Sequence, residues 1–347
     1  KTYIELMIER RIFNTLKYKL VSKGYSFKKL FWFTGTFAFF ISPVADNLTT
    51  ALILSTVLIT IEKKNPAFLV PGAINIVVGA NAGGAWSPFG DITTLMPWIA
   101  GKAEFFDFFY LFPAAFLGWL VTGWLLSFSV PEGKPLFDAN TEERVRVLKG
   151  GRTVIYLGAF TIFSAVMCQQ VFVIPPMWGM MFGFSLLKLY SYQLKRSHDE
   201  ELKTFIAISK IEHDTLLFFF GILAAVGGLH YVGYLDLAVK LYDTAGATAV
   251  NIGVGFLSAF IDNVPVMSAV LKASPNMGVD QWLLVTMTAG IGGSLISFGS
   301  AAGVGVMGKL RGVYTFGSHM KYAWTVLVGY ILSLVIWYVQ FEILGLY

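Results

Sequence analysis

Two stretches of the chain each place an acidic residue and an asparagine between strongly apolar runs. Residues 40–54 read FISPVADNLTTALIL, and residues 256–271 read FLSAFIDNVPVMSAVL. Their matching polar positions are Ser42, Asp46 and Asn47 in the first stretch and Ser258, Asp262 and Asn263 in the second. An unpaired carboxylate is costly to bury. An aspartate nevertheless occurs at the matching position of both stretches, which indicates a functional role for Asp46 and Asp262. Helix capping is the alternative, because Asp and Asn are favoured at helix N-termini, and we expect the two asparagines to serve as caps.

Each stretch is followed by a glycine-rich segment that should break a helix. Residues 74–98 read INIVVGANAGGAWSPFGDITTLMPW, and residues 287–308 read MTAGIGGSLISFGSAAGVGVMG. The segments align Gly83-Gly84 with Gly292-Gly293, Ser87 with Ser297, Gly90 with Gly299 and Asp91 with Ser300. Such breaks free carbonyl and amide groups that can coordinate ions. Neither segment contains the G-x-x-x-x-G-K-[ST] pattern of a phosphate-binding loop, so a phosphate cradle is disfavoured.

The composition of the chain indicates which elements must hold these residues. Of its 347 residues, 56% are hydrophobic, the mean hydropathy is +0.66, and 14% are charged, against roughly a quarter in soluble domains. Several uncharged runs reach the ~20 residues that cross a bilayer as helix. They are 108–130, 153–187 (two crossings split at Pro175-Pro176), 215–235, 281–308 and 322–341. We predict an all-α polytopic membrane protein, and the lone Cys168 excludes an intrachain disulfide.

The distribution of Lys and Arg predicts a topology, because cytoplasmic loops carry an excess of these residues. Clusters at 10–29 with 63–64, at 134–152, at 188–210 and at 309–321 hold 22 of the 26 basic residues. We place all of them in the cytoplasm, which explains the basic charge without a nucleic-acid partner. The apolar stretch 30–61 then has both ends in the cytoplasm, which describes a re-entrant helical hairpin.

The second copy of the motif, about 247–272, lacks a basic flank and would enter from the other side. Two copies facing opposite ways form an inverted repeat, which typically holds its substrate near the midplane. We predict a single transport domain over 1–347, with a first repeat over 1–130, a cytoplasmic loop over 131–152 and a second repeat over 153–347. The first repeat lacks the opening helices of the second, so we expect residues to precede Lys1 in the natural protein.

The acidic residues inside the membrane body are candidate cation ligands, since intramembrane charges are expensive and usually functional. A carboxylate with amide, hydroxyl and carbonyl oxygens nearby is a hard ligand set, which suits a hard cation. We place Na⁺ at Asp46, Asp262 and neighbouring oxygens, where Na⁺ and H⁺ would compete. Capping alone is a stronger alternative for Asp91. The neutral oxygens near the breaks belong to Asn81, Thr93, Thr94, Ser297 and Ser300.

Two further polar residues, Glu212 and His213, lie at the predicted cytoplasmic start of 215–235. They either cap the helix at the interface or serve in proton entry or pH sensing, since His titrates near neutrality. His319 should lie at the membrane interface.

Several of these stretches resemble the NhaD-type Na⁺/H⁺ antiporters: FWFTGTFAFFISPVADNLTTALIL, NIVVGANAGGAWSPFGDITTLMPW, FLSAFIDNVPVMSAVL and VYTFGSHMKY. These belong to an ion-transporter superfamily with arsenite permeases and divalent-anion/Na⁺ symporters. The resemblance covers essentially the whole chain. It implies exchange of Na⁺ and Li⁺ for H⁺ by alternating access, no cofactor, and a homodimer. It also implies ion-site roles for Asp46, Asn47, Asn81, Asp91, Thr93, Thr94, Ser258, Asp262, Asn263, Ser297 and Ser300, and it matches Glu212 to a glutamate at the membrane boundary.

Other functions remain open from the sequence. An anion transporter of the same superfamily, carrying arsenite, citrate or a dicarboxylate, is the nearest rival. In the symporter relatives the hairpin tips resemble a neutral Ser-Asn-Thr, whereas Asp46 and Asp262 here favour a cation. An intramembrane aspartyl protease, which uses two aspartates as acid and base, is a remote alternative. We expect a bacterial inner membrane location ahead of a plastid envelope.

Overall fold

The computed structural model describes residues 2–15, 18, 24–62, 65–135, 146–198, 202–209 and 213–346, and within these ranges every regular element is a helix. The prediction of an all-α chain is therefore confirmed for the described residues. The helices divide between two compact units, Lys1–Tyr25 with Pro135–His213 and Ser26–Lys134 with Asp214–Tyr347.

The described residues of the smaller unit form the helices α1 (Thr2–Glu9), α8 (Gly151–Gln170), α9 (Met177–His198) and α10 (Thr204–Ser209). Helices α8 and α9 pack against each other, and α1 packs against α8 and α10. Leu6, Val154 and Leu187 are buried in their shared core. The chain turns between α8 and α9 around Pro175-Pro176, as predicted.

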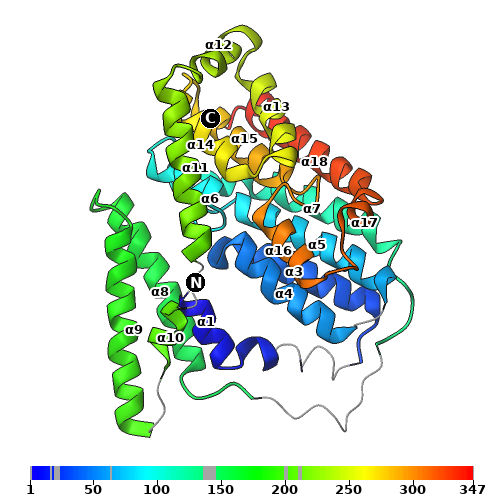
Figure 1. Ribbon diagram of the computed structural model, residues 1–347, viewed down its shortest axis with the longest axis vertical. Helices are drawn as coiled ribbons and strands as arrows, with labels where there is room; N and C mark the ends of the chain where they lie inside the picture. The colour runs from blue at the N-terminus through cyan, green and yellow to red at the C-terminus, as the bar shows by residue number, and fades with distance from the viewer. Residues whose placement is uncertain are drawn as a thin grey trace. The chain divides into compact units, whose positions relative to one another are not determined.

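The larger unit begins with α3 (Phe27–Ala45), α4 (Asn47–Ile61), α5 (Pro66–Ala85), α6 (Ile92–Ile99), a 3₁₀ turn (Asp107–Leu111) and α7 (Phe112–Ser127). Ser26 caps α3 by accepting from the Lys29 N–H, and Asn65 caps α5, whose first residue is proline. Helices α3 and α4 contact each other, and both contact α5 (Figure 1). Because α5 has no charged side chain and is rich in Gly and Ala, it can be buried almost from end to end.

The second half of this unit contains the remaining described helices. It comprises α11 (His213–Tyr231), α12 (Asp236–Ala245), α13 (Ala247–Phe260), α14 (Asn263–Ala273), α15 (Val279–Gly292), α16 (Ala301–Lys309), α17 (Phe316–Met320), α18 (Ala323–Tyr338) and a π turn (Val339–Ile343). Helices α13, α14 and α15 contact one another as α3, α4 and α5 do. Contacts also cross between the halves: α4 packs on α16, α14 on α6, α5 on α15 and α7 on α18.

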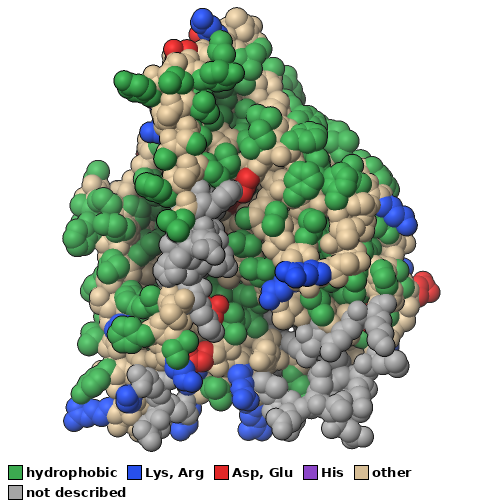
Figure 2. Space-filling view, viewed as in Figure 1, with side chains coloured by type: hydrophobic (Ala, Val, Ile, Leu, Met, Phe, Trp, Pro, Cys, Tyr) green, Lys and Arg blue, Asp and Glu red, His purple; other side chains and the backbone are tan. Residues whose placement is uncertain are grey.

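Four helices of the described chain are long and apolar enough to cross a membrane: Pro66–Ala85, Asp107–Ser127, Gly151–Gln169 and Ala323–Ile343. A further apolar pair, Phe220–Tyr231 and Asp236–Ala245, bends by 76° at its break. Large hydrophobic side chains such as Tyr156, Phe163 and Phe220 are exposed. Figure 2 shows hydrophobic side chains over much of the visible face, with few charges among them. Such a surface suits lipid better than water, in agreement with the predicted polytopic membrane protein.

Candidate functional site

The four helices that follow the two Asp-Asn motifs and the two glycine-rich breaks each begin at a polar capping residue. Asp46 caps α4 by accepting from the Thr49 N–H at 2.8 Å and from the Thr49 hydroxyl at 2.7 Å. Asp262 caps α14, Asp91 caps α6 and Ser300 caps α16. The expectation that the two asparagines cap the hairpin helices was wrong. The preceding aspartates do so, because a carboxylate complements the positive end of the helix dipole better than a neutral amide.

In both breaks, the backbones of two glycines lie in close contact. A Cβ atom at Gly84 would lie 2.6 Å from the Gly90 carbonyl oxygen, and one at Gly293 would lie 2.6 Å from the Gly299 carbonyl oxygen. Only glycine permits so close an approach of the backbone. This shared contact agrees with the alignment of Gly84 with Gly293 and of Gly90 with Gly299.

Serine hydroxyls tie the hairpin helices to the broken helices in both halves. The Ser42 hydroxyl donates to the Ala80 carbonyl at 2.6 Å, and the Ser258 hydroxyl donates to the Ala289 carbonyl at 2.7 Å. Both sites are buried, so these bonds satisfy carbonyl groups near the C-terminal ends of α5 and α15. Ser258, a predicted site residue, therefore holds helices together in the structure.

The Asp91 carboxylate is the point where the two halves meet. Its Oδ2 accepts from Asn47 Nδ2 at 2.7 Å and from Asn263 Nδ2 at 2.9 Å. Its Oδ1 accepts from the Thr93 N–H at 3.2 Å. Asp91 is 5% exposed, and both asparagines are buried. One amide from each Asp-Asn motif thus binds the same carboxylate oxygen, and charge-assisted bonds of this kind are among the stronger ones in proteins.

Asn81 extends the cluster to the second break. Its Oδ1 accepts from Asn47 Nδ2 at 3.1 Å, and its Nδ2 donates to the hydroxyls of Ser294 and Ser300 at 2.8 and 2.9 Å. Sequence reasoning missed Ser294, although it directly follows the Gly292-Gly293 pair. All three hydrogen-bonding groups of the Asn81 amide are used, so this side chain has a single orientation.

Some buried hydroxyls have no hydrogen-bond partner among the described residues. Thr93 Oγ1 and Ser297 Oγ, both predicted site residues, are in this state. Thr50 Oγ1 on α4 and Ser268 Oγ on α14 also have no hydrogen-bond partner among the described residues, and the sequence did not predict them as site residues. Buried polar atoms are rarely left unpaired, so these oxygens are candidate partners for a bound cation or water. The Thr94 hydroxyl is instead used in the capping box with Asp91.

Asp46 and Asp262, where the sequence placed Na⁺, are only half-buried. Their carboxylates serve the caps of α4 and α14, and neither is hydrogen-bonded to the Asp91 carboxylate in the described part of the chain. Asp46 has a backbone φ of +61°, a conformation that Asp tolerates better than most residues. The geometry thus makes Asp91 the central carboxylate. Asp46 and Asp262 are each followed in the sequence by an asparagine that donates to Asp91.

The electrostatics of the cluster follow from the helix ends. The N-termini of α4, α6, α14 and α16 bring partial positive charge to their caps, and three of these caps are carboxylates. The C-termini of α3, α5, α13 and α15 end at the same breaks and leave carbonyl groups without helical partners. Carboxylate, hydroxyl and carbonyl oxygens suit a hard cation, and a carboxylate can hold a proton instead.

Glu212 lies outside the described residues, and His213 is the first residue of α11.

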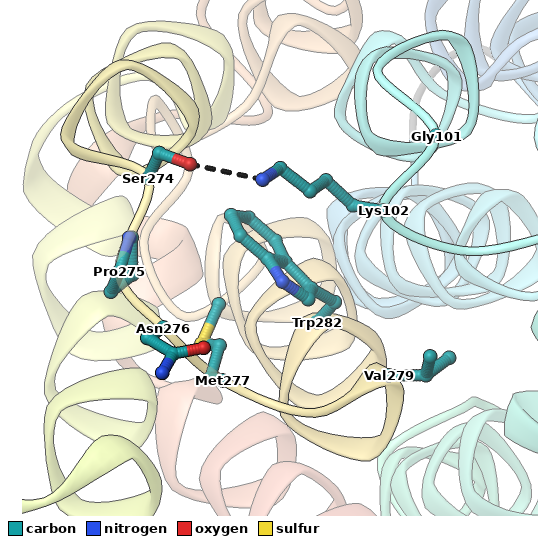
Figure 3. Close-up of a pocket in the computed structure, with 8 residues that line it drawn as sticks. All are labelled: Gly101, Lys102, Ser274, Pro275, Asn276, Met277, Val279 and Trp282. Atoms are coloured by element: carbon teal, nitrogen blue, oxygen red, sulfur yellow. Dashed lines mark hydrogen bonds between the residues drawn. The ribbon is translucent and has the colours of Figure 1, made fainter.

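A separate open pocket of about 370 Å³ lies where α6 and α14 end. Lys102 follows α6; its Nζ donates to the Ser274 hydroxyl at 2.9 Å and lies 5.1 Å from the ring centre of Trp282 (Figure 3). Ser274 is the residue after α14. The two helices that begin beside the Asp91 cluster are therefore joined again at their other ends.

Comparisons with known proteins find transporters that are similar to this chain. A family model described as a citrate transporter matches residues 2–290. The Na⁺/H⁺ antiporter NhaD of Vibrio cholerae is 44% identical over 361 residues, which cover 96% of this chain and 75% of that protein. The NhaD of Vibrio parahaemolyticus is 44% identical over 95% of this chain and 85% of its own length. Sodium/proton antiporter 1 of Arabidopsis thaliana is 30% identical, with 84% of this chain and 53% of that protein covered.

Proposed function

The chain belongs to the NhaD group of Na⁺/H⁺ antiporters and, through its family model, to the wider citrate-transporter family, and from this we propose that it exchanges Na⁺ and Li⁺ for H⁺ across a membrane. Members of this group are multi-pass transporters and not enzymes, which removes the aspartyl-protease alternative. They need no cofactor, since Na⁺ and H⁺ are the transported substrates. The observation that carries the proposal is the buried Asp91 carboxylate bound by one asparagine from each motif.

Exchange follows if the cation and the proton occupy Asp91 in turn. In one state Na⁺ binds the carboxylate with the free hydroxyls of Thr93 and Ser297. In the other state a proton neutralises the carboxylate and the cation leaves. Asp46 and Asp262 add negative charge that favours a cation. The site would then change the side of the membrane to which it opens only when it is loaded with Na⁺ or protonated, which couples the two flows.

Alternating access is supported by the doubled arrangement of the larger unit. Helices α3–α6 and α13–α16 make matching contacts, and the positive charges predict opposite orientations in the membrane. We therefore retain the proposal of inverted repeats, each with a re-entrant hairpin and a broken helix. The division at 1–130, 131–152 and 153–347, the homodimer and the bacterial inner membrane location remain parts of the same proposal.

An anion transporter is the second candidate, because the matching family model is described as a citrate transporter. In such a transporter, helix N-termini would bind the negative substrate. Here the N-termini of α4, α6 and α14 are already occupied by carboxylates of their own chain. Fixed negative charge at these positions opposes an anion, so the geometry supports a cation.

The test uses everted membrane vesicles from a bacterial host that lacks its own Na⁺/H⁺ antiporters, with an acid interior. Addition of Na⁺ or Li⁺ should dissipate the pH gradient reported by a fluorescent dye, while K⁺ should not. Radiolabelled citrate uptake is measured in the same vesicles. Citrate uptake without a response to Na⁺ would replace the antiporter with the anion transporter.

Asn47 and Asn263 should each contribute to the affinity for the cation, because each donates one hydrogen bond to Asp91. Replacing either by alanine removes one of the two amide donors to Asp91 Oδ2 and leaves the carboxylate less well held. A hydrogen bond to a charged group is worth about 1.5 to 3 kcal/mol, so the Na⁺ concentration for half-maximal response should rise about ten- to a hundredfold. The exposed Asn276 lies in the pocket of Figure 3, and its replacement by alanine serves as the matched control. Unchanged Na⁺ dependence in both Asn47→Ala and Asn263→Ala would contradict a site centred on Asp91.

A further inference from the structure

His319 is buried, although the sequence placed it at the membrane interface. It lies on α17, is 0% exposed, and uses both ring nitrogens. Its Nδ1 is 2.8 Å from the Tyr314 hydroxyl, and its Nε2 is 3.2 Å from the Leu295 carbonyl oxygen. Helix α17 packs against α5 and α18, so His319 is buried among protein side chains, whatever its depth in the membrane.

The partners of His319 define its tautomer. The Leu295 carbonyl can only accept a hydrogen bond, so Nε2 must carry the proton. A neutral ring then leaves Nδ1 as an acceptor, and the Tyr314 hydroxyl donates to it. Burial lowers the pKa of His319 to about 4, so the ring stays neutral over the physiological range.

Leu295 belongs to the break between α15 and α16, next to a residue of the Asp91 cluster. Ser294 precedes it, and the Ser294 hydroxyl accepts from Asn81 Nδ2 at 2.8 Å. Ser300, at the other end of the break, accepts from the same nitrogen at 2.9 Å. The break has no regular helical bonding of its own, so its position depends on contacts such as the one that His319 makes with Leu295.

We propose that His319 is a positioning residue for the cation site, which holds the Leu295 carbonyl and so keeps Ser294 in reach of Asn81. Asn81 in turn accepts from Asn47, which donates to Asp91. A chain of direct contacts thus joins α17 to the central carboxylate. This inference rests on the proposed function, since the affinity that it affects is that for Na⁺.

Two substitutions of His319 separate this role from others. Gln can place an amide N–H where Nε2 lies, so His319→Gln retains the donor to Leu295. Asn is shorter and reaches only the Nδ1 position, so His319→Asn loses that donor while it keeps an acceptor for Tyr314. In the vesicle assay, His319→Asn should raise the Na⁺ concentration for half-maximal response at least about fivefold, since a neutral hydrogen bond is worth about 1 kcal/mol. His319→Gln should stay within about twofold of the wild type.

The pH profile distinguishes positioning from pH sensing. Because the ring is neutral throughout the working range, the midpoint of the pH profile should be the same in the wild type and in both variants. A shifted midpoint in His319→Gln with unchanged Na⁺ affinity in His319→Asn would overturn the proposal in favour of a sensor. Equal loss of affinity in both variants would also overturn it, because Gln preserves the bond on which the proposal depends.

A second pair of variants covers the case in which His319→Asn does not fold. Ser294→Ala should lower Na⁺ affinity, because it removes the hydroxyl that His319 positions. Tyr314→Phe should leave the affinity within about twofold, because the bond to Leu295 remains. The reverse result would overturn the proposal. A wild type that does not respond to Na⁺ would overturn the proposed function as well, whereas an active wild type with an unaffected His319→Asn would overturn only this inference.

Discussion

Replacement of Asp91 by asparagine should abolish Na⁺-dependent dissipation of the pH gradient. Asparagine cannot carry the charge that holds Na⁺ or the proton that replaces it. Removing one partner from a buried charge pair costs about 3 to 5 kcal/mol, so we expect the Na⁺ response to fall at least about a hundredfold. The measurement is the vesicle assay, with Na⁺ titrated up to the highest concentration that the vesicles tolerate.

The matched control for this variant is Asp107→Asn. Asp107 is also buried, and its carboxylate also accepts a backbone N–H, that of Glu104 at 2.7 Å. Asparagine at position 91 offers one acceptor oxygen, so either the Thr93 N–H or the two amides lose their acceptor. Thermal unfolding of the purified variants in detergent therefore accompanies the assay. A folded Asp91→Asn protein that still responds to Na⁺ would show that the exchange runs through Asp46 or Asp262, as the sequence alone suggested.

Replacement of Gly292 by alanine should disrupt the packing of α13 against α15. The new Cβ atom would meet the carbonyl oxygen of Gly255, and a backbone atom cannot move aside as a flexible side chain can. Overpacking of a well-packed core costs about 3 kcal/mol at the upper end of its usual range. For a unit of this size we expect the unfolding midpoint to fall by roughly 6 to 12 °C.

Gly253→Ala is the matched control for this prediction, because Gly253 lies on α13 and has no atom within 4 Å of an added Cβ. It should leave the midpoint unchanged or raise it, since alanine favours helix by about 1 kcal/mol over glycine. Gly83→Ala should behave like Gly292→Ala, because its Cβ would meet the Phe39 carbonyl oxygen in the first half. Equal midpoints for Gly292→Ala and Gly253→Ala would contradict the close approach of α13 and α15.

The comparison of the two halves explains why only one of them supplies the central carboxylate. Asp91 and Ser300 hold equivalent places as caps of α6 and α16. The amides of both Asp-Asn motifs point to Asp91, while Ser300 accepts from Asn81. A single buried carboxylate with two amide donors avoids the repulsion that a second buried aspartate would add. The doubled fold thus holds a single central carboxylate.

The sequence by itself determined the features that depend on neighbouring residues. Long apolar runs predict helices, and the glycines and polar residues at 83–91 and 292–300 predict the breaks between them. The repeat of Asp-Asn indicated where two helices would start, because capping acts within a few residues. The family resemblance rested on the same local stretches, and it supplied the residues that meet at Asp91.

Only the tertiary structure decided which of those residues lies at the centre. Asn263 and Asp91 are 172 positions apart, and Asn81 and Ser300 are 219 apart. The burial of His319 and the contact of Ser294 with Asn81 depend on distant helices in the same way. A hydrogen bond between such residues follows from the packing of whole helices, and no pattern of neighbouring residues records it.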